Sequence, residues 1–181
     1  MNRPLHLLIG AVLSAAPLVA AAQTPPPPPP AEAKTMADAY VTAAGMSDLY
    51  EINASQVALQ RSQNPAVKKF AQMMIDHHQK TTAATVKAAQ KAGLNPAPPA
   101  LDAGATASIN ELQSASGADF DRLYLGQQVP AHQAALDLNQ SYASGGDKAP
   151  LKASAKAAVA IVKRHLAEAT KLQGGSGAAG M

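Results

Sequence analysis

The 181-residue chain contains no cysteine and no tryptophan, and only two phenylalanines and four tyrosines. Without cysteine, no disulfide bond can stabilise the fold, and no thiolate can bind a metal or act as a nucleophile. With so few large side chains, the core must be thin and filled mainly by small residues, which requires its elements to approach closely. This composition favours a helical bundle over a sheet.

Other absences exclude classes of function. The formal net charge is only +3, and no basic stripe is interleaved with aromatic residues, so we expect no nucleic-acid partner. No G-x-S-x-G motif is present and the serines are scattered, so serine hydrolase chemistry has no support. The sequence predicts no catalytic residue and no organic cofactor.

The N-terminus has the features of a secretory signal peptide. Arg3 lies in a short polar n-region, residues 7–19 are apolar, and residues 20–22 are alanines that offer a cleavage site. We therefore predict a signal peptide over residues 1–22 and an exported, periplasmic protein. The alternative is an uncleaved N-terminus that anchors the chain in the inner membrane and associates it with the cell envelope, although the apolar run is shorter than the ~20 residues of a typical span.

Low-complexity segments flank the remaining domain. Six consecutive prolines, residues 25–30, lie in a linker over residues 23–34, and we expect a stiff extended spacer there because proline lacks a backbone donor. Residues 174–181 are rich in glycine and are expected to form a flexible tail. The folded domain is therefore expected over residues 35–173.

Capping and breaking residues divide this domain into helices. Thr35 is a candidate N-cap, Asn64 and Pro65 form a capped helix start, and Gly93 is a stop signal. The predicted long helices cover residues 35–62, 65–92, 118–142 and 149–172, and a short helix covers residues 106–114. This pattern predicts an all-α fold, an antiparallel up-down four-helix bundle with a short extra helix in the crossover between helices two and three.

Each long helix carries one metal-binding residue type on its small or apolar stripe. These residues are Glu51, His78, His132 and His165. Burial of such groups is unfavourable unless they find partners, so the pattern indicates an internal polar site. If helices two and three are antiparallel, the first three residues lie at similar depth, whereas His165 is offset by roughly 7 Å. We therefore expect His165 to lie nearer Asp121 and Tyr124.

Two interpretations of this polar site remain open. Imidazole and carboxylate ligands suit a divalent transition metal such as Zn, Fe, Cu or Mn, with His77 and Asp121 as further candidate ligands. Alternatively, buried histidines paired with carboxylates or tyrosines fix the register of the helices without any ion. Metal-dependent redox catalysis is a third, weaker hypothesis.

Four segments resemble the exported bacterial family known as domain of unknown function 4142: YEINASQVAL, NPAVKKFAQMMIDHHQKT, DFDRLYLGQQVPAHQAAL and AIVKRHLAEA. The resemblance covers residues 36–172 and implies a ferritin-like four-helix domain, in a family whose members are often labelled membrane proteins. Its pattern falls on Glu51, on the pair His77 and His78, and on Asp121, His132 and His165. This chain departs from the pattern at His77, where the family usually has aspartate.

The resemblance does not bring ferritin chemistry with it. A di-iron site requires Glu-x-x-His pairs, and Glu51 is followed three residues later by Ala54. We therefore expect an exported helical-bundle protein that binds one divalent metal through an internal Glu/His cluster. The alternative is a structural or interaction module of the cell envelope with no metal.

Overall fold

The computed structural model describes residues 25–178, so the predicted signal peptide and residues 179–181 lie outside the described part of the chain. That part contains five α-helices, one short 3-10 helix and no strand, which confirms the all-α prediction. The elements are η1 (Ala31–Lys34), α1 (Ala37–Arg61), α2 (Pro65–Lys91), α3 (Ala103–Ser114), α4 (Gly117–Gly145) and α5 (Ala149–Ala178). Among these helices, none combines the length and hydrophobicity that crossing a bilayer requires.

The second helix begins and ends where the sequence predicts. The Asn64 side chain accepts a hydrogen bond from the Ala66 backbone N–H at 2.9 Å, with Pro65 in the first turn. Beyond the other end, Gly93 adopts a φ of 82°, a left-handed conformation that glycine tolerates and most residues do not. Thr35, by contrast, does not cap α1; it follows η1, and the N-cap position belongs to Met36, which makes no side-chain cap.

The C-terminal helix is longer than expected. α5 continues past Leu172 to Ala178, so the first part of the predicted flexible tail, including Gly174 and Gly175, is helical. Glycine weakens a helix but permits it, and no proline follows to end it.

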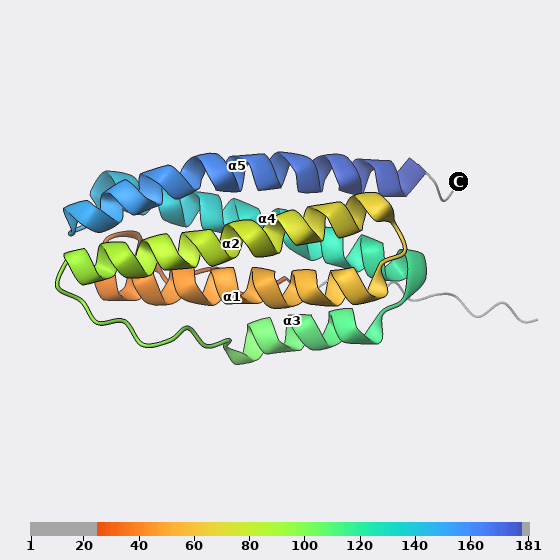
Figure 1. Ribbon diagram of the computed structural model, residues 1–181, viewed down its shortest axis with the longest axis horizontal. Coiled ribbons are helices and arrows are strands. Elements are labelled where there is room, and N and C mark those ends of the chain that lie inside the picture. The colour runs from red at the N-terminus through yellow and green to blue at the C-terminus, as the bar shows by residue number, and fades with distance from the viewer. Residues whose placement is uncertain (1–24, 179–181) are drawn as a thin grey trace, which may run out of the picture.

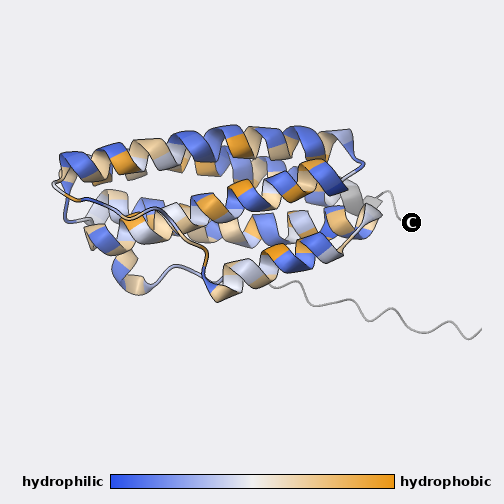
Figure 2. Cartoon of the chain, turned by 60° about the horizontal axis from the view of Figure 1, so that its bottom comes forward, coloured by the Kyte–Doolittle hydropathy of each residue, from blue (hydrophilic) through white to orange (hydrophobic). Residues whose placement is uncertain are grey.

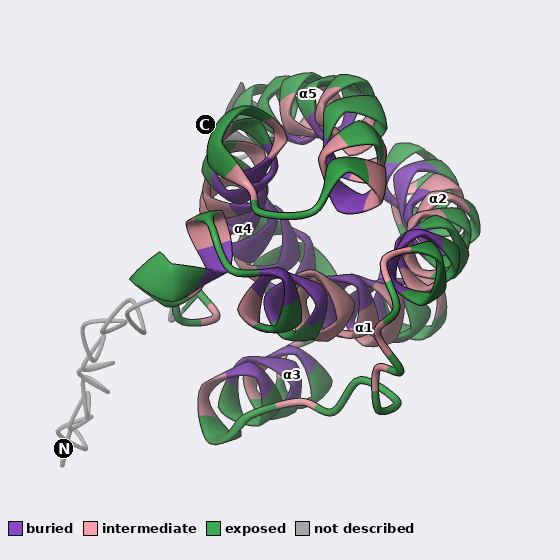
Figure 3. Cartoon of the chain, turned by 90° about the vertical axis from the view of Figure 1, so that its left-hand side faces the viewer, coloured by how far each residue is buried: buried purple, intermediate pink, exposed green. Residues whose placement is uncertain are grey.

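The four long helices form a bundle in which α1 packs on α2 and α4, and α5 closes the other side against α2 and α4 (Figures 1 and 3). The short helix α3 lies outside, against α1. Hydrogen bonds join Tyr40 to Asn139 and Ser55 to Tyr124, so α1 and α4 are antiparallel. Since α1 is also antiparallel to α2, helices α2 and α4 run in the same direction (Figure 1).

This direction corrects the expected up-down order, in which the second and third long helices are antiparallel. The crossover of residues 92–102 and α3 together carry the chain back along the bundle before α4 begins. The short helix was predicted from residue 106, but its N-cap is Asp102, whose side chain accepts from the Ala105 N–H at 2.7 Å.

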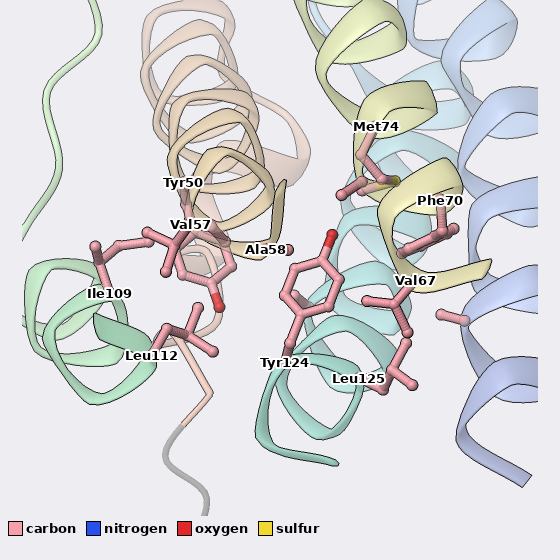
Figure 4. Close-up of a cluster of buried hydrophobic side chains, with 14 of the residues drawn as sticks. Tyr50, Val57, Ala58, Val67, Phe70, Met74, Ile109, Leu112, Tyr124 and Leu125 are labelled. Carbon is pink, nitrogen blue, oxygen red and sulfur yellow. The ribbon is translucent and has the colours of Figure 1, made fainter. Parts of the chain in front are cut away.

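The core consists of two apolar clusters with a polar layer between them. One cluster includes Phe70, Met74, Tyr124 and Leu125 (Figure 4), together with many alanines. The second cluster includes the stacked rings of Tyr40 and Tyr142, whose centroids lie 4.0 Å apart, and the side chains Ala33, Ala88, Ala89, Leu138, Leu151 and Ala155. Figure 2 shows hydrophobic and hydrophilic residues interspersed along the helices. Along α2, α4 and α5, the residues His78, His132 and His165 lie between the two clusters.

The proline run packs against the bundle and is not a free spacer. Pro26, Pro27 and Pro29 line a small cavity together with Tyr50 and residues of α3 and α4. Gly104 allows this contact, because a Cβ there would lie 2.7 Å from the Pro27 side chain. The predicted linker also contains η1, whose Ala33 is fully buried. Proline rings present an apolar surface, which explains why they pack on an alanine-rich surface.

Candidate metal centre

Three buried imidazoles from three helices meet in the polar layer. His78 lies on α2, His132 on α4 and His165 on α5, and their relative exposures are 4%, 1% and 0%. One ring nitrogen of each lies within 4.8 Å of the corresponding nitrogens of the other two. The ring centroids are separated by 5.2 to 5.8 Å. We call these residues the histidine triad.

The helix directions explain why His78 and His132 lie at one depth. Because α2 and α4 start at the same end of the bundle, His78 and His132, which lie 13 and 15 residues after Pro65 and Gly117, differ by only ~3 Å in height. The predicted pairing of these two residues is therefore correct, although it was predicted from antiparallel helices. The predicted 7 Å offset of His165 is wrong, and His165 does not lie beside Asp121.

Each triad imidazole has one ring nitrogen engaged in a hydrogen bond. The Nδ1 of His78 lies 2.7 Å from the Asp48 carboxylate, and the Nδ1 of His132 donates to the backbone carbonyl of Gln128 at 2.8 Å. The Nε2 of His165 lies 2.8 Å from the Nδ1 of His77. Such outer partners fix the orientation and tautomer of a metal-binding imidazole.

The remaining nitrogens of the triad have no hydrogen-bond partner among the described residues. They are the Nε2 of His78, the Nε2 of His132 and the Nδ1 of His165, and all three are buried. Leaving a buried polar atom unpaired costs about 1–3 kcal/mol, so three such atoms on neighbouring rings need an explanation. A bound metal ion would satisfy all three.

Electrostatics keep two of the three imidazoles neutral. Burial, with the nearby His78, lowers the pKa of His132 to about 3 and that of His165 to about 2. For His78, burial also lowers the pKa, but the hydrogen bond and charge of Asp48 outweigh it, so the pKa of His78 is raised. At neutral pH, His132 and His165 are therefore neutral imidazoles, each with one ring nitrogen free of a proton, as metal ligands must be.

Asp48 is a site residue that the sequence analysis missed. Its carboxylate accepts hydrogen bonds from Thr81 and Thr82, both at 2.9 Å, in addition to its contact with His78. The signal was present, because Asp48 precedes Glu51 by three residues and therefore shares its helix face.

Glu51 lies beside the triad. The residue is 1% exposed, and its carboxylate lies 3.7 Å from the Nδ1 of His132. One carboxylate oxygen has no hydrogen-bond partner among the described residues. Burial raises its pKa to about 7, although His78 acts in the opposite direction. The structure thus brings Glu51 to the predicted centre, as a neighbour of a triad member.

Of the other two predicted site residues, His77 contacts the triad and Asp121 does not. His77 is partly exposed, and its ring stacks on His165 with a centroid distance of 5.1 Å, so it touches the triad from outside. Asp121 does not join the site, because it precedes His132 by 11 residues, or ~16 Å along α4. It lies near the cluster of Phe120 and Tyr124.

These observations define a class of protein: a helical bundle with a buried cluster of three histidines. The chain belongs to the family described as Domain of unknown function (DUF4142), whose model matches residues 22–172. No protein of curated function matches the chain.

Solved structures with a similar fold include those of a protein called CopM. The Cu(I)-bound form is 17% identical with a TM-score of 0.63, covering 75% of this chain and 94% of that chain. The Cu(II)-bound form is 16% identical with a TM-score of 0.65, covering 77% and 97%. The Ag-bound form is 18% identical with a TM-score of 0.62, covering 75% and 93%. At this identity the similarity shows a shared fold.

Proposed function

We propose that this protein binds one transition-metal ion, with copper as the preferred metal, through His78, His132 and His165. The observation that carries the proposal is the convergence of three buried imidazoles, each with one unpaired nitrogen. The bundle supplies each ligand from a different helix, so the site forms only in the folded protein.

The chemistry of the ligands supports copper. Imidazole suits copper, zinc, iron and nickel, and among divalent first-row ions Cu²⁺ binds most tightly to a given set of ligands. The protein CopM, which shares the fold, has been solved in Cu(I)-bound, Cu(II)-bound and Ag-bound forms. We extend copper binding to this chain because its own three-nitrogen cluster suits the metal.

The alternative of a metal-free structural module explains the site less well. A network that serves only helix register is expected to pair both nitrogens of each buried imidazole. Here one nitrogen of each triad member is paired, and the other has no partner in the part of the chain that the structure describes. The described residues therefore favour a ligand over a purely structural network.

We also propose that the bundle is ferritin-like and that the protein acts in the periplasm after export. A four-helix bundle with one long crossover is the connectivity of ferritin-like folds, and here that crossover joins α2 to α4. The signal peptide predicted over residues 1–22 supports export. Without a Glu-x-x-His pair, we propose metal binding and no ferroxidase activity.

Metal titration of the purified mature chain, residues 23–181, tests the function. We expect one equivalent of copper to bind, in competition with a chromophoric chelator for Cu(I) and by calorimetry for Cu(II). His132→Ala should abolish this binding, while Asp76→Ala, an exposed change on α2 near the site, should leave it intact. The proposal fails if copper does not bind stoichiometrically or if His132→Ala binds as tightly as the wild type.

Zinc provides a comparison of metals, and thermal unfolding provides an independent readout. A metal that binds only the folded chain stabilises it by about 2.7 kcal/mol at a free concentration of 100 times Kd. Copper should raise the melting temperature of the wild type and not that of His132→Ala. Tighter binding of Zn²⁺ than of Cu²⁺ would reject the preference for copper.

A further inference from the structure

The outer hydrogen-bond partners of the triad are not equivalent. His78 is held by a buried carboxylate and His132 by a backbone carbonyl of its own helix. His165 is held by another imidazole, that of His77 on α2, which is partly exposed to solvent. The ligand from α5 is therefore oriented across the α2–α5 contact by a residue at the protein surface.

The position of one proton decides whether His165 can bind a metal. Its unpaired nitrogen is Nδ1, so a neutral, metal-binding His165 must carry its proton on Nε2. That Nε2–H then donates to the Nδ1 of His77, which lies 2.8 Å away, and the proton of His77 resides on its own Nε2. In this arrangement His77 accepts a hydrogen bond from His165 and donates none to it.

Arg164 favours the opposite arrangement. Its Nη2 lies 3.5 Å from the Nε2 of His77, and a guanidinium can only donate. When His77 accepts there, its proton moves to Nδ1 and it donates to His165. The proton of neutral His165 then lies on Nδ1, where it blocks the metal. The two arrangements contain the same number of protons and differ only in tautomer.

We propose that His77 is a positioning residue for the metal centre, which orients His165 and sets its tautomer by accepting a hydrogen bond from His165 Nε2, and that Arg164 opposes this state. The inference rests on the proposed metal-binding function and adds a residue that does not touch the ion. Outer partners of this kind change metal affinity by about 10- to 100-fold.

A series of substitutions at His77 in the mature chain tests the proposal. His77→Leu removes the acceptor and should weaken copper binding by about 10- to 100-fold, mainly through faster release of the metal to a chelator. His77→Asn offers a carbonyl oxygen close to the former Nδ1 and should restore an affinity close to that of the wild type. Arg164→Met should bind at least as tightly as the wild type.

Two readouts separate positioning from a general structural effect. The melting temperatures of the metal-free variants monitor folding, which a change at this partly exposed position should barely alter. The electron paramagnetic resonance spectrum of the Cu(II) complex should change in His77→Leu and return toward the wild-type spectrum in His77→Asn.

The outcomes distinguish the two proposals. A wild-type chain that binds no metal rejects the proposed function, and the role of His77 with it. A wild-type chain that binds copper, with His77→Leu equally tight or His77→Asn as weak as His77→Leu, rejects only the role of His77. If Arg164→Met bound copper more weakly than the wild type, the proposed role of Arg164 in opposing the metal-binding tautomer would be wrong.

Discussion

The Asp48 carboxylate lies 2.7 Å from the Nδ1 of His78 and joins α1 to the histidine triad. Thr81 and Thr82 donate to the other carboxylate oxygen, so the orientation of Asp48 is fixed from α2. Among the three outer partners of the triad, Asp48 is the charged one, and it has the strongest effect on the tautomer of its imidazole.

Asp48→Asn should weaken copper binding by about 10- to 100-fold, because the neutral amide accepts a weaker hydrogen bond from the His78 Nδ1–H than the carboxylate does. The pKa of His78 should fall, since burial lowers it and the opposing contribution of Asp48 is lost. Competition titration measures the first effect and a histidine NMR titration measures the second. Asp76→Asn is the control, and equal losses in both variants would contradict a specific role for Asp48.

The metal-free domain should lose stability in acid. Unfolded histidines titrate near 6.5, whereas the pKa values of His132 and His165 in the fold are about 3 and about 2. Between these values the unfolded chain binds more protons, so the free energy of unfolding falls as the pH falls below about 6.5, by up to about 1.4 kcal/mol per pH unit for each group. Glu51 offsets part of this loss between its unfolded value of 4.5 and its folded pKa of about 7, so the loss steepens below about pH 4.5.

Urea unfolding between pH 4 and pH 7 measures this dependence. His132→Leu removes one titrating group and should flatten the slope below pH 6.5. A slope unchanged by His132→Leu would contradict the assignment.

Glu51→Gln should stabilise the metal-free protein at alkaline pH. The pKa of Glu51 is raised by burial from 4.5 to about 7, so this carboxyl lowers the free energy of unfolding as the pH rises from 4.5 to about 7. At pH 8 the variant should be more stable than the wild type by on the order of 3 kcal/mol, and the difference should vanish near pH 4.5. Denaturant unfolding at both pH values checks this, and a difference that does not vary with pH would refute it.

Gly146→Ala should destabilise the fold by about 1–3 kcal/mol. A Cβ at this position would lie 2.6 Å from the carbonyl oxygen of Tyr142 and 2.5 Å from its ring, which stacks on Tyr40. Gly174→Ala is the matched control, because no described residue lies within 4 Å of its Cβ position, and alanine there should stabilise α5 by roughly 0.5–1 kcal/mol. Thermal unfolding compares the two variants, and similar effects of the same sign would contradict the steric argument.

Local signals in the sequence predicted much of the fold. Asn64, Pro65 and Gly93 place the boundaries of α2 because their effects depend on the neighbouring backbone alone. The helical spacing also placed His78, His132 and His165 on inward faces, since the period of 3.6 residues is a local property. The packing of the prolines of residues 25–30 was not predicted, because it depends on the alanine-rich surface of the bundle.

The sequence by itself determined that the protein is helical and that polar residues occur on the buried faces of its four long helices. Only the tertiary structure decided which of those residues meet. The crossover makes α2 and α4 parallel, and the packing of the four long helices brings His165 into the triad with His78 and His132. Asp48 and His77 become outer partners of the triad, whereas Asp121 lies about 16 Å from His132 along α4. Helix order and direction depend on contacts between distant segments, which a local period does not encode.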